Sequence, residues 1–183
     1  MSTILITGGA RSGKSTYAEK ITAKMGKEIV YIATSIPFDE GMKDRIKKHR
    51  ESRPKEWATI EIYKDFKKLL NNDSFINSDT VLLDCITVMI SNLLMDSDID
   101  FDKASSDDID KLEESVFKEV KELLKVINNK NLILVTNEVG MGLVPHYKLG
   151  SIFRDIQGRV NQYLAKKADE VYLAVSGIPM KVK

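Results

Sequence analysis

The stretch ITGGARSGKS, residues 6–15, decides the fold that this sequence predicts. Gly8 is followed after four residues by Gly13, Lys14 and Ser15, which is the spacing of the phosphate-binding P-loop, GxxxxGK[ST]. The short apolar run TILIT precedes the loop, and TYAEKITAKM, which has a helical pattern, follows it. Because a P-loop joins a strand to a helix, this context indicates an α/β protein of the P-loop NTPase type.

The residue types in this loop suit the binding of a polyphosphate. Gly8, Gly9 and Gly13 lack Cβ atoms, so consecutive backbone N–H groups can approach phosphate oxygens closely. The Lys14 ammonium can bind the β and γ phosphates, and the Ser15 hydroxyl can ligate the Mg²⁺ that bridges them. The alternative is a glycine-rich turn that binds no ligand, and the complete signature in its expected context disfavours it.

Apolar runs alternate with helical patterns along the rest of the chain. Strands buried on both faces and separated by helices are typical of a mainly parallel sheet, so we expect a three-layer α/β fold. The length fits a single domain, 1–183. The predicted strands are Thr3–Thr7, Ile29–Ala33, Thr59–Tyr63, Thr80–Asp84, Leu132–Thr136 and Glu170–Val175, and the predicted helices are Lys14–Met25, Glu40–Glu51, Lys64–Leu70, Ile86–Met95, Asp108–Ile127 and Ser151–Lys167.

Asp84 is the candidate for the second half of a nucleotide site. It ends the apolar run TVLLD, which is the arrangement of the acidic residue that holds Mg²⁺ in P-loop enzymes. The alternative is that Asp84 only caps the helix that follows. The Asn-Lys-x-Asp motif by which familiar GTPases recognise guanine is absent, since NNKN at residues 128–131 lacks the aspartate. The base preference is therefore left open.

Composition excludes several other classes of protein. The formal net charge of +1 predicts no general attraction to nucleic acid or to an anionic membrane. Cys85 is the only cysteine, which excludes an intrachain disulfide and a cysteine-based zinc cluster and suits a cytoplasmic protein. The most apolar stretch, residues 81–95, is too short to span a membrane and contains Asp84. The N-terminal residues do not follow the pattern of a cleaved signal peptide.

His49 is a candidate nucleophile in the basic segment MKDRIKKHRESRP. Arg45, His49 and Arg53 recur at helical spacing, so the imidazole lies in a file of cations. Such cations would attract a polyphosphate and disfavour the imidazolium, and a neutral imidazole is able to attack phosphorus. The alternatives, which spacing alone favours, are a structural or solvated histidine and a solvated basic face. His146 has no recognisable partners, and we assign it no role.

Taken together, several stretches resemble one family over essentially the whole chain. They are LITGGARSGKS, VYIATS, RIKKHRESRP, LLDCIT, LVTNEVGMGLVP and FRDIQGRVNQYLA, in this order, with VYLAVSGIPMKVK at the end. They look like the bifunctional adenosylcobinamide kinase and adenosylcobinamide-phosphate guanylyltransferase family of cobalamin biosynthesis. The pair GGARSGKS and TNEVGMGLVP is much more specific than a P-loop alone.

The resemblance implies two reactions on a corrinoid substrate. The aminopropanol hydroxyl of adenosylcobinamide would be phosphorylated by ATP or GTP, and GMP would then pass from GTP to that phosphate through a guanylyl-histidine at His49, with release of pyrophosphate. It also implies a homotrimer, which composition does not show. Some relatives have glutamate at the position of Asp84, and both residues are hard oxygen ligands. The implied nucleotide contacts are Gly8, Gly9, Ala10, Arg11, Ser12, Gly13, Lys14, Ser15, Ala33, Thr34, Ser35, Arg50, Glu51, Ser52, Arg53, Glu61 and Asp84.

Two other functions compete with this hypothesis. A monofunctional small-molecule kinase would use Lys14, Ser15 and Asp84 and would leave His49 idle. A nucleotide-switched interaction module would hydrolyse its ligand slowly and would bind another protein in a ligand-dependent way. A covalent nucleotide on the protein separates the first hypothesis from both alternatives.

Overall fold

The computed structural model describes residues 1–35, 54, 56–142 and 144–183. Its centre is a seven-stranded sheet in the order β3-β2-β4-β5-β1-β6-β7. Neighbouring strands are parallel except for β7, which is antiparallel to β6. The strands are β1 (Thr3–Gly8), β2 (Ile29–Ala33), β3 (Ala58–Glu61), β4 (Thr80–Asp84), β5 (Asn131–Val135), β6 (Glu170–Val175) and β7 (Ile178–Lys181).

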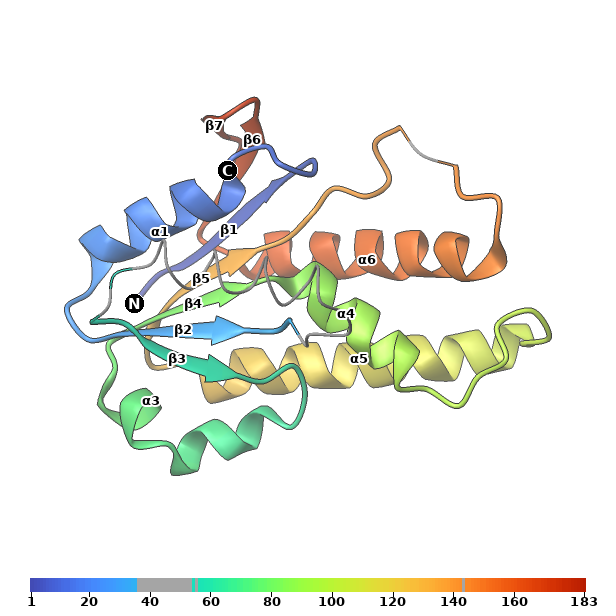
Figure 1. Cartoon of the computed structure of the whole chain (residues 1–183), viewed down its shortest axis with the longest axis horizontal. Coiled ribbons are helices and arrows are strands. Elements are labelled where there is room, and N and C mark those ends of the chain that lie inside the picture. Colours follow the sequence, from blue (N-terminus) through green and yellow to red (C-terminus); the bar gives the residue numbers. More distant parts are fainter. Residues whose placement is uncertain (36–53, 55, 143) are drawn as a thin grey trace.

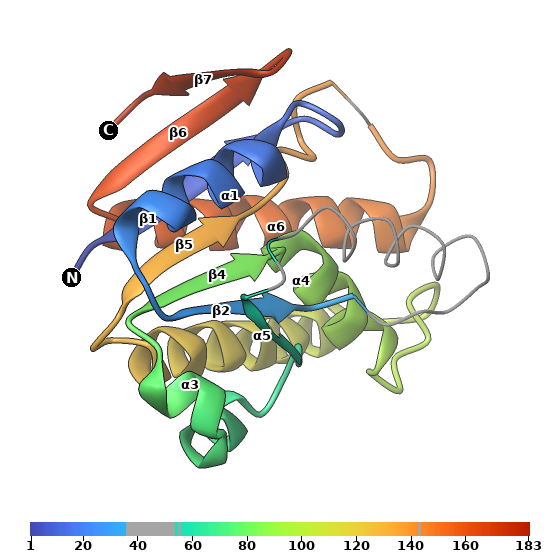
Figure 2. The ribbon, with the colours of Figure 1, turned by 60° about the vertical axis from the view of Figure 1, so that its left-hand side comes forward.

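Helices cover both faces of the sheet and make the three layers that the sequence predicts. Figure 2 shows α1 in front of the strands and α5 and α6 behind them. One apolar cluster joins the sheet to α4, α5, α6 and the short helices at its edge, and a second joins the other face to α1. The helices are α1 (Lys14–Met25), η1 (Phe66–Asn71), α3 (Asp73–Asn77), α4 (Ile86–Met95), α5 (Ser106–Val126) and α6 (Lys148–Lys167).

The sequence predicts most of these elements within a few residues. The six predicted strands are present, and the predicted helix at residues 64–70 is the 3-10 helix η1. The helix predicted at Glu40–Glu51 falls outside the described residues. Two elements were not predicted: the five-residue helix α3 and the C-terminal strand β7. Both are short, and β7 has only one neighbouring strand, so neither has a full apolar period to reveal it.

The order of the strands positions the candidate site. β5 lies between β1 and β4, with Val135 paired to Ile6 on one side and to Asp84 on the other. Asp84 is paired in turn with Ala33 of β2. Parallel strands bring their carboxyl ends to one edge of the sheet, which is where ligands bind in open α/β folds. The loop after β1, the end of β4 and the segment after β5 therefore meet at this edge (Figure 1).

Within the part of the chain that the structure describes, no helix is long and apolar enough to cross a membrane.

Candidate functional site

The loop between β1 and α1 has the backbone conformation that its glycines predict. Gly8 has φ +149° and Gly13 has φ +88°, and Gly13 is the N-terminal cap of α1. A Cβ on Gly8 would collide with the carbonyl oxygen of Ala174, and one on Gly13 would lie 3.0 Å from Gly177 Cα. Both positions therefore require glycine. Residues with a side chain rarely adopt such φ values, and a Cβ would be too close to its neighbours.

A turn that the sequence reasoning missed braces this loop. β6 and β7 are joined through Ser176 and Gly177, with φ +51° and +85°, and Gly177 N donates a hydrogen bond of 2.9 Å to Ser12 O. Two successive positive φ angles are typical of a tight hairpin turn, and a Ser-Gly pair is the sequence signal that could have revealed it. The C-terminal hairpin thus supports the phosphate-binding loop from the side (Figure 2).

Lys14 is buried at the start of α1, with 7% of its surface exposed. Its Nζ donates a hydrogen bond of 2.5 Å to Gly9 O and one of 3.4 Å to Ser12 Oγ, so the ammonium is held inside the loop. Burial lowers the pKa of Lys14, and the nearby Cys85 and Asp84 act in the opposite direction. No side chain of the described residues caps α1, which leaves its first N–H groups available to an anion.

Asp84 lies where the sequence predicts it, at the carboxyl end of β4. Its Oδ2 accepts a hydrogen bond of 3.1 Å from Tyr31 Oη of the neighbouring strand β2. Ser15 follows Lys14 in the first turn of α1. Two hard oxygen donors are thus present at the same edge of the sheet, as P-loop magnesium sites require. Among the described residues there is no group of three or more ligands that would hold a metal ion without help from a nucleotide.

Thr34 connects the end of β2 to the residue after Asp84. Thr34 Oγ1 donates to Cys85 O at 2.8 Å and accepts from Cys85 N at 3.0 Å, and Thr34 O accepts from Asn92 Nδ2 at 2.7 Å. Burial raises the pKa of Cys85 to about 12, with a smaller contribution from Asp84. A thiol with a raised pKa is a poor nucleophile, so Cys85 has a structural place here. Thr34 is engaged in holding the backbone at Cys85.

The structure gathers most, but not all, of the predicted site. Ala33 ends β2, the strand next to Asp84, and Thr34 and Ser35 follow it. Glu61 is exposed on the outer strand β3 and is paired with Ala33. Glu61 is thus two strands away from Asp84. His49 and the four residues after it lie outside the described residues: Arg50, Glu51, Ser52 and Arg53.

A buried polar network beside the loop was not predicted. Thr136 Oγ1 donates to Asn161 Oδ1 at 2.7 Å, and Gln157 Nε2 donates to both of these oxygens at 2.9 Å. Glu138 Oε1 accepts hydrogen bonds from Thr7 Oγ1 at 2.7 Å and from Asn161 Nδ2 at 3.2 Å. The run TNE directly after a buried strand was the available signal, since polar residues at that edge of a sheet are candidates for function.

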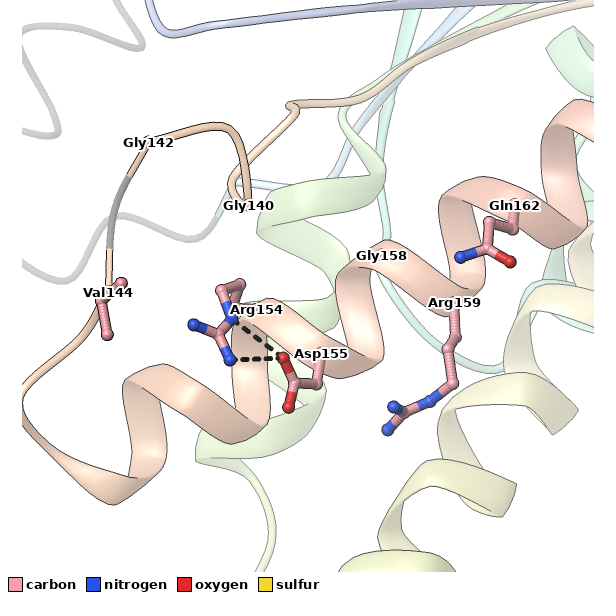
Figure 3. Close-up of a pocket in the computed structure, with 8 residues that line it drawn as sticks. All are labelled: Gly140, Gly142, Val144, Arg154, Asp155, Gly158, Arg159 and Gln162. Carbon is pink, nitrogen blue, oxygen red and sulfur yellow. Dashed lines mark hydrogen bonds and ion pairs between the residues drawn. The ribbon is translucent and has the colours of Figure 1, made fainter.

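A surface pocket of about 520 Å³ lies between α6 and the loop that follows β5 (Figure 3). Arg154 is turned toward Asp155 and forms an ion pair of 2.8 Å with it, while Arg159 points away from that pair and binds Glu113 of α5. The lining is completed by small and polar residues from the loop and the helix, namely Gly140, Gly142, Val144, Gly158 and Gln162.

The sequence matches one family model over nearly its whole length. The model is described as cobinamide kinase / cobinamide phosphate guanyltransferase, and it matches residues 4–182. The bifunctional adenosylcobalamin biosynthesis protein CobU of Escherichia coli is 44% identical over 98% of this chain and 99% of the relative. The protein of the same name from Salmonella typhimurium is 43% identical over the same shares, and CobP of Pseudomonas aeruginosa is 35% identical over 98% and 96%.

A solved structure of a prototypical ATPase from the type III secretion system of pathogenic bacteria has a similar fold. It matches with a TM-score of 0.51 at 11% sequence identity. The match covers 94% of this chain and 51% of that one, so this chain spans about half the length of that ATPase. The likeness confirms the predicted α/β fold of the P-loop type.

Proposed function

The chain belongs to the cobinamide kinase / cobinamide phosphate guanyltransferase family, and from that premise we propose how its residues divide the work of two reactions. It is a bifunctional enzyme of adenosylcobalamin biosynthesis that acts as a kinase and as a guanylyltransferase on a corrinoid. In the first reaction adenosylcobinamide is phosphorylated on its aminopropanol hydroxyl. In the second, GMP from GTP is joined to that phosphate, which gives adenosyl-GDP-cobinamide and pyrophosphate.

The observation that carries the first assignment is the geometry of the loop at residues 8–15. Its glycines open the backbone to phosphate, and the buried Lys14 ammonium lies within the loop that would cradle the β and γ phosphates. Charge spreads over the phosphate oxygens in the transition state of phosphoryl transfer, so a positioned cation lowers the barrier. Lys14 is thus assigned a catalytic role, with the loop residues, Ala33, Thr34, Ser35 and the more distant Glu61 as nucleotide contacts.

The oxygen donors of Ser15 and Asp84 fit a Mg²⁺ ion that a nucleotide brings with it. Ser15 lies in the first turn of α1, and Asp84 has a second carboxylate oxygen besides the one that Tyr31 contacts. When bound, the ion would neutralise charge on the β and γ phosphates. Ser15 would hold it directly and Asp84 would orient its water shell. Removal of the divalent ion with EDTA should therefore stop both reactions.

His49 is assigned the second reaction as the nucleophile that carries GMP. A neutral imidazole attacks the α phosphorus of GTP, pyrophosphate leaves, and the corrinoid phosphate then displaces the histidine. Support comes from the match of RIKKHRESRP with the family pattern and from the cations around His49, which favour the neutral ring. Arg50, Glu51, Ser52 and Arg53 are assigned to the nucleotide on the same grounds.

The deciding experiment labels the protein with GTP that is radioactive at the α phosphorus. Wild type, His49→Ala and His146→Ala would be incubated with Mg²⁺ and the label, then treated with acid or base. Because His146 is the only other histidine and is exposed, it is a matched control for the chemistry of the side chain. We expect acid-labile, base-stable label on wild type and His146→Ala and none on His49→Ala.

The opposite result would reassign the chemistry. Wild-type protein that stays unlabelled, yet still transfers γ-phosphate to adenosylcobinamide, would remove His49 from the mechanism. Label that persists on His49→Ala and disappears from His146→Ala would place the nucleophile on the loop after β5 instead.

Further assignments complete the proposal. We infer a single domain over residues 1–183, a cytoplasmic location and a homotrimer, the last from the family resemblance. A surface strip on β7, with Ile178 67% and Met180 46% exposed, is a suitable place for a subunit contact. Light scattering on the purified protein would measure the mass directly.

A further inference from the structure

Glu138 lies in the middle of the sheet edge that carries the proposed nucleotide site. Glu138 N donates a hydrogen bond of 3.1 Å to Gly8 O, the first glycine of the phosphate-binding loop. Its strand, β5, is flanked by β1, which leads into that loop, and by β4, which ends in Asp84. Glu138 therefore follows the strand that separates the two halves of the nucleotide site.

The side chain of Glu138 is held by one of its two oxygens. Oε1 accepts both hydrogen bonds, from Thr7 Oγ1 and from Asn161 Nδ2, and Asn161 is itself fixed by Thr136 and Gln157. Within the described residues Oε2 has no hydrogen-bond partner, and no lysine, arginine or histidine forms an ion pair with Glu138. The network thus fixes the carboxylate while leaving one oxygen able to accept a proton.

The surface pocket is lined by residues that are close in sequence to Glu138 and to its partners on α6. Gly140, which lines the pocket, is two residues after Glu138 in the same loop. Gly158 and Gln162, which line it from α6, directly follow Gln157 and Asn161 of the network (Figure 3).

We propose that Glu138 is the general base of the kinase reaction. As the aminopropanol hydroxyl oxygen bonds to the γ phosphorus, its proton passes to Glu138 Oε2, and the bond from the γ phosphorus to the bridging oxygen breaks to release the nucleoside diphosphate. This inference rests on the nucleotide site proposed above. It assigns Glu138 to one reaction only, because in guanylyl transfer the attacking atoms are the unprotonated nitrogen of a neutral imidazole and an ionised phosphate oxygen, and neither attacking atom carries a proton.

The test is Glu138→Gln, which keeps an oxygen for Thr7 and Asn161 and removes only the basic oxygen. We expect kcat for phosphorylation of adenosylcobinamide to fall about 100- to 1,000-fold, with KM for the nucleotide within about threefold of wild type. Labelling of the protein by GTP, and transfer of GMP to adenosylcobinamide phosphate supplied directly, should stay within about twofold.

Two further variants serve as controls for Glu138→Gln. Glu114→Gln changes an exposed glutamate on α5 and should leave both reactions unchanged. Glu138→Asp keeps the charge at a shorter reach, so it should lose kinase activity more mildly, about tenfold. It also replaces the Gln variant as the test if that protein melts well below wild type.

The proposal is overturned by kinase activity of Glu138→Gln within about threefold of wild type. It is equally overturned if both reactions fall together with nucleotide affinity, since that pattern belongs to a residue that only shapes the loop. Failure of the underlying nucleotide site would look different: Lys14→Met would then retain full kinase activity, whatever Glu138→Gln did.

Discussion

The phosphate-binding loop and the segment at residues 136–138 lie side by side at one edge of the sheet, yet they are held in different ways. Backbone conformation and the absence of Cβ atoms shape the loop, and a second backbone turn braces it. Side-chain hydrogen bonds from α4 and α6 hold the segment. The loop thus exposes backbone N–H groups, whereas the segment presents side chains that hydrogen bonds hold in place, among them the Glu138 carboxylate.

Among the variants that test this comparison, Gly8→Ala should have the largest effect on stability and on nucleotide binding. The new Cβ would collide with the Ala174 carbonyl, and φ of +149° is strained for alanine. We expect a loss of more than about 3 kcal/mol in the free energy of unfolding, together with loss of nucleotide binding. Urea denaturation and a nucleotide titration would measure the two effects.

Gly9→Ala is the matched control, because a Cβ there meets no atom within 4 Å and Gly9 has no positive φ. Its unfolding free energy should stay within about 0.5 kcal/mol of wild type. Equal destabilisation by the two variants would mean that close packing on β6 does not hold the loop.

This contrast explains which parts of the site the sequence could predict. The loop at residues 8–15 is contiguous, and its glycine spacing carries the geometry, so the motif gives the strand, the turn, the helix and Lys14 together. Asp84 could be predicted as well, because it ends a run of buried apolar strand residues. The network joins Thr7, Glu138 and Asn161 across the chain, and no local pattern reveals such partners.

The short elements were missed for a related reason. β7 is an edge strand of four residues whose pairing depends on the turn before it, and α3 is a single turn started by the Asn72 side chain. Neither shows a hydrophobic period long enough to predict it. The placement of His49 relative to the loop stays a prediction, since it lies outside the described residues.

A smaller effect should follow from Thr136→Val, which tests the side-chain network. Valine has nearly the same shape, but it removes the hydroxyl that donates to Asn161 and accepts from Gln157, in a fully buried place. Leaving such groups short of partners should cost about 1–3 kcal/mol in the free energy of unfolding. Urea denaturation measures it, and a cost below about 0.5 kcal/mol would show that the network does not hold this edge.

Gln157→Met gives the comparison within the same network. Gln157 Oε1 is buried without a hydrogen-bond partner among the described residues, so methionine removes an unsatisfied atom along with two donated bonds. Thr136 and Asn161 still bind each other in this variant. The cost should therefore be under about 1 kcal/mol and smaller than that of Thr136→Val. A larger cost for Gln157→Met than for Thr136→Val would mean that the network depends more on Gln157 of α6 than on Thr136 after β5.

The smallest effect should come from Arg159→Ala, on the outer side of the same helix α6. Arg159 makes a two-point contact with Glu113 of α5, but about half of its side chain is exposed, so water and salt screen the pair. The free energy of unfolding should fall by less than about 1 kcal/mol, and a double-mutant cycle with Glu113→Ala should give a coupling of the same size. Kinase activity should change less than in Glu138→Gln, because Arg159 lines the pocket without touching the network. A coupling well above that bound would mean that the exposed face of α6, and not only its buried face, fixes the side-chain half of the site.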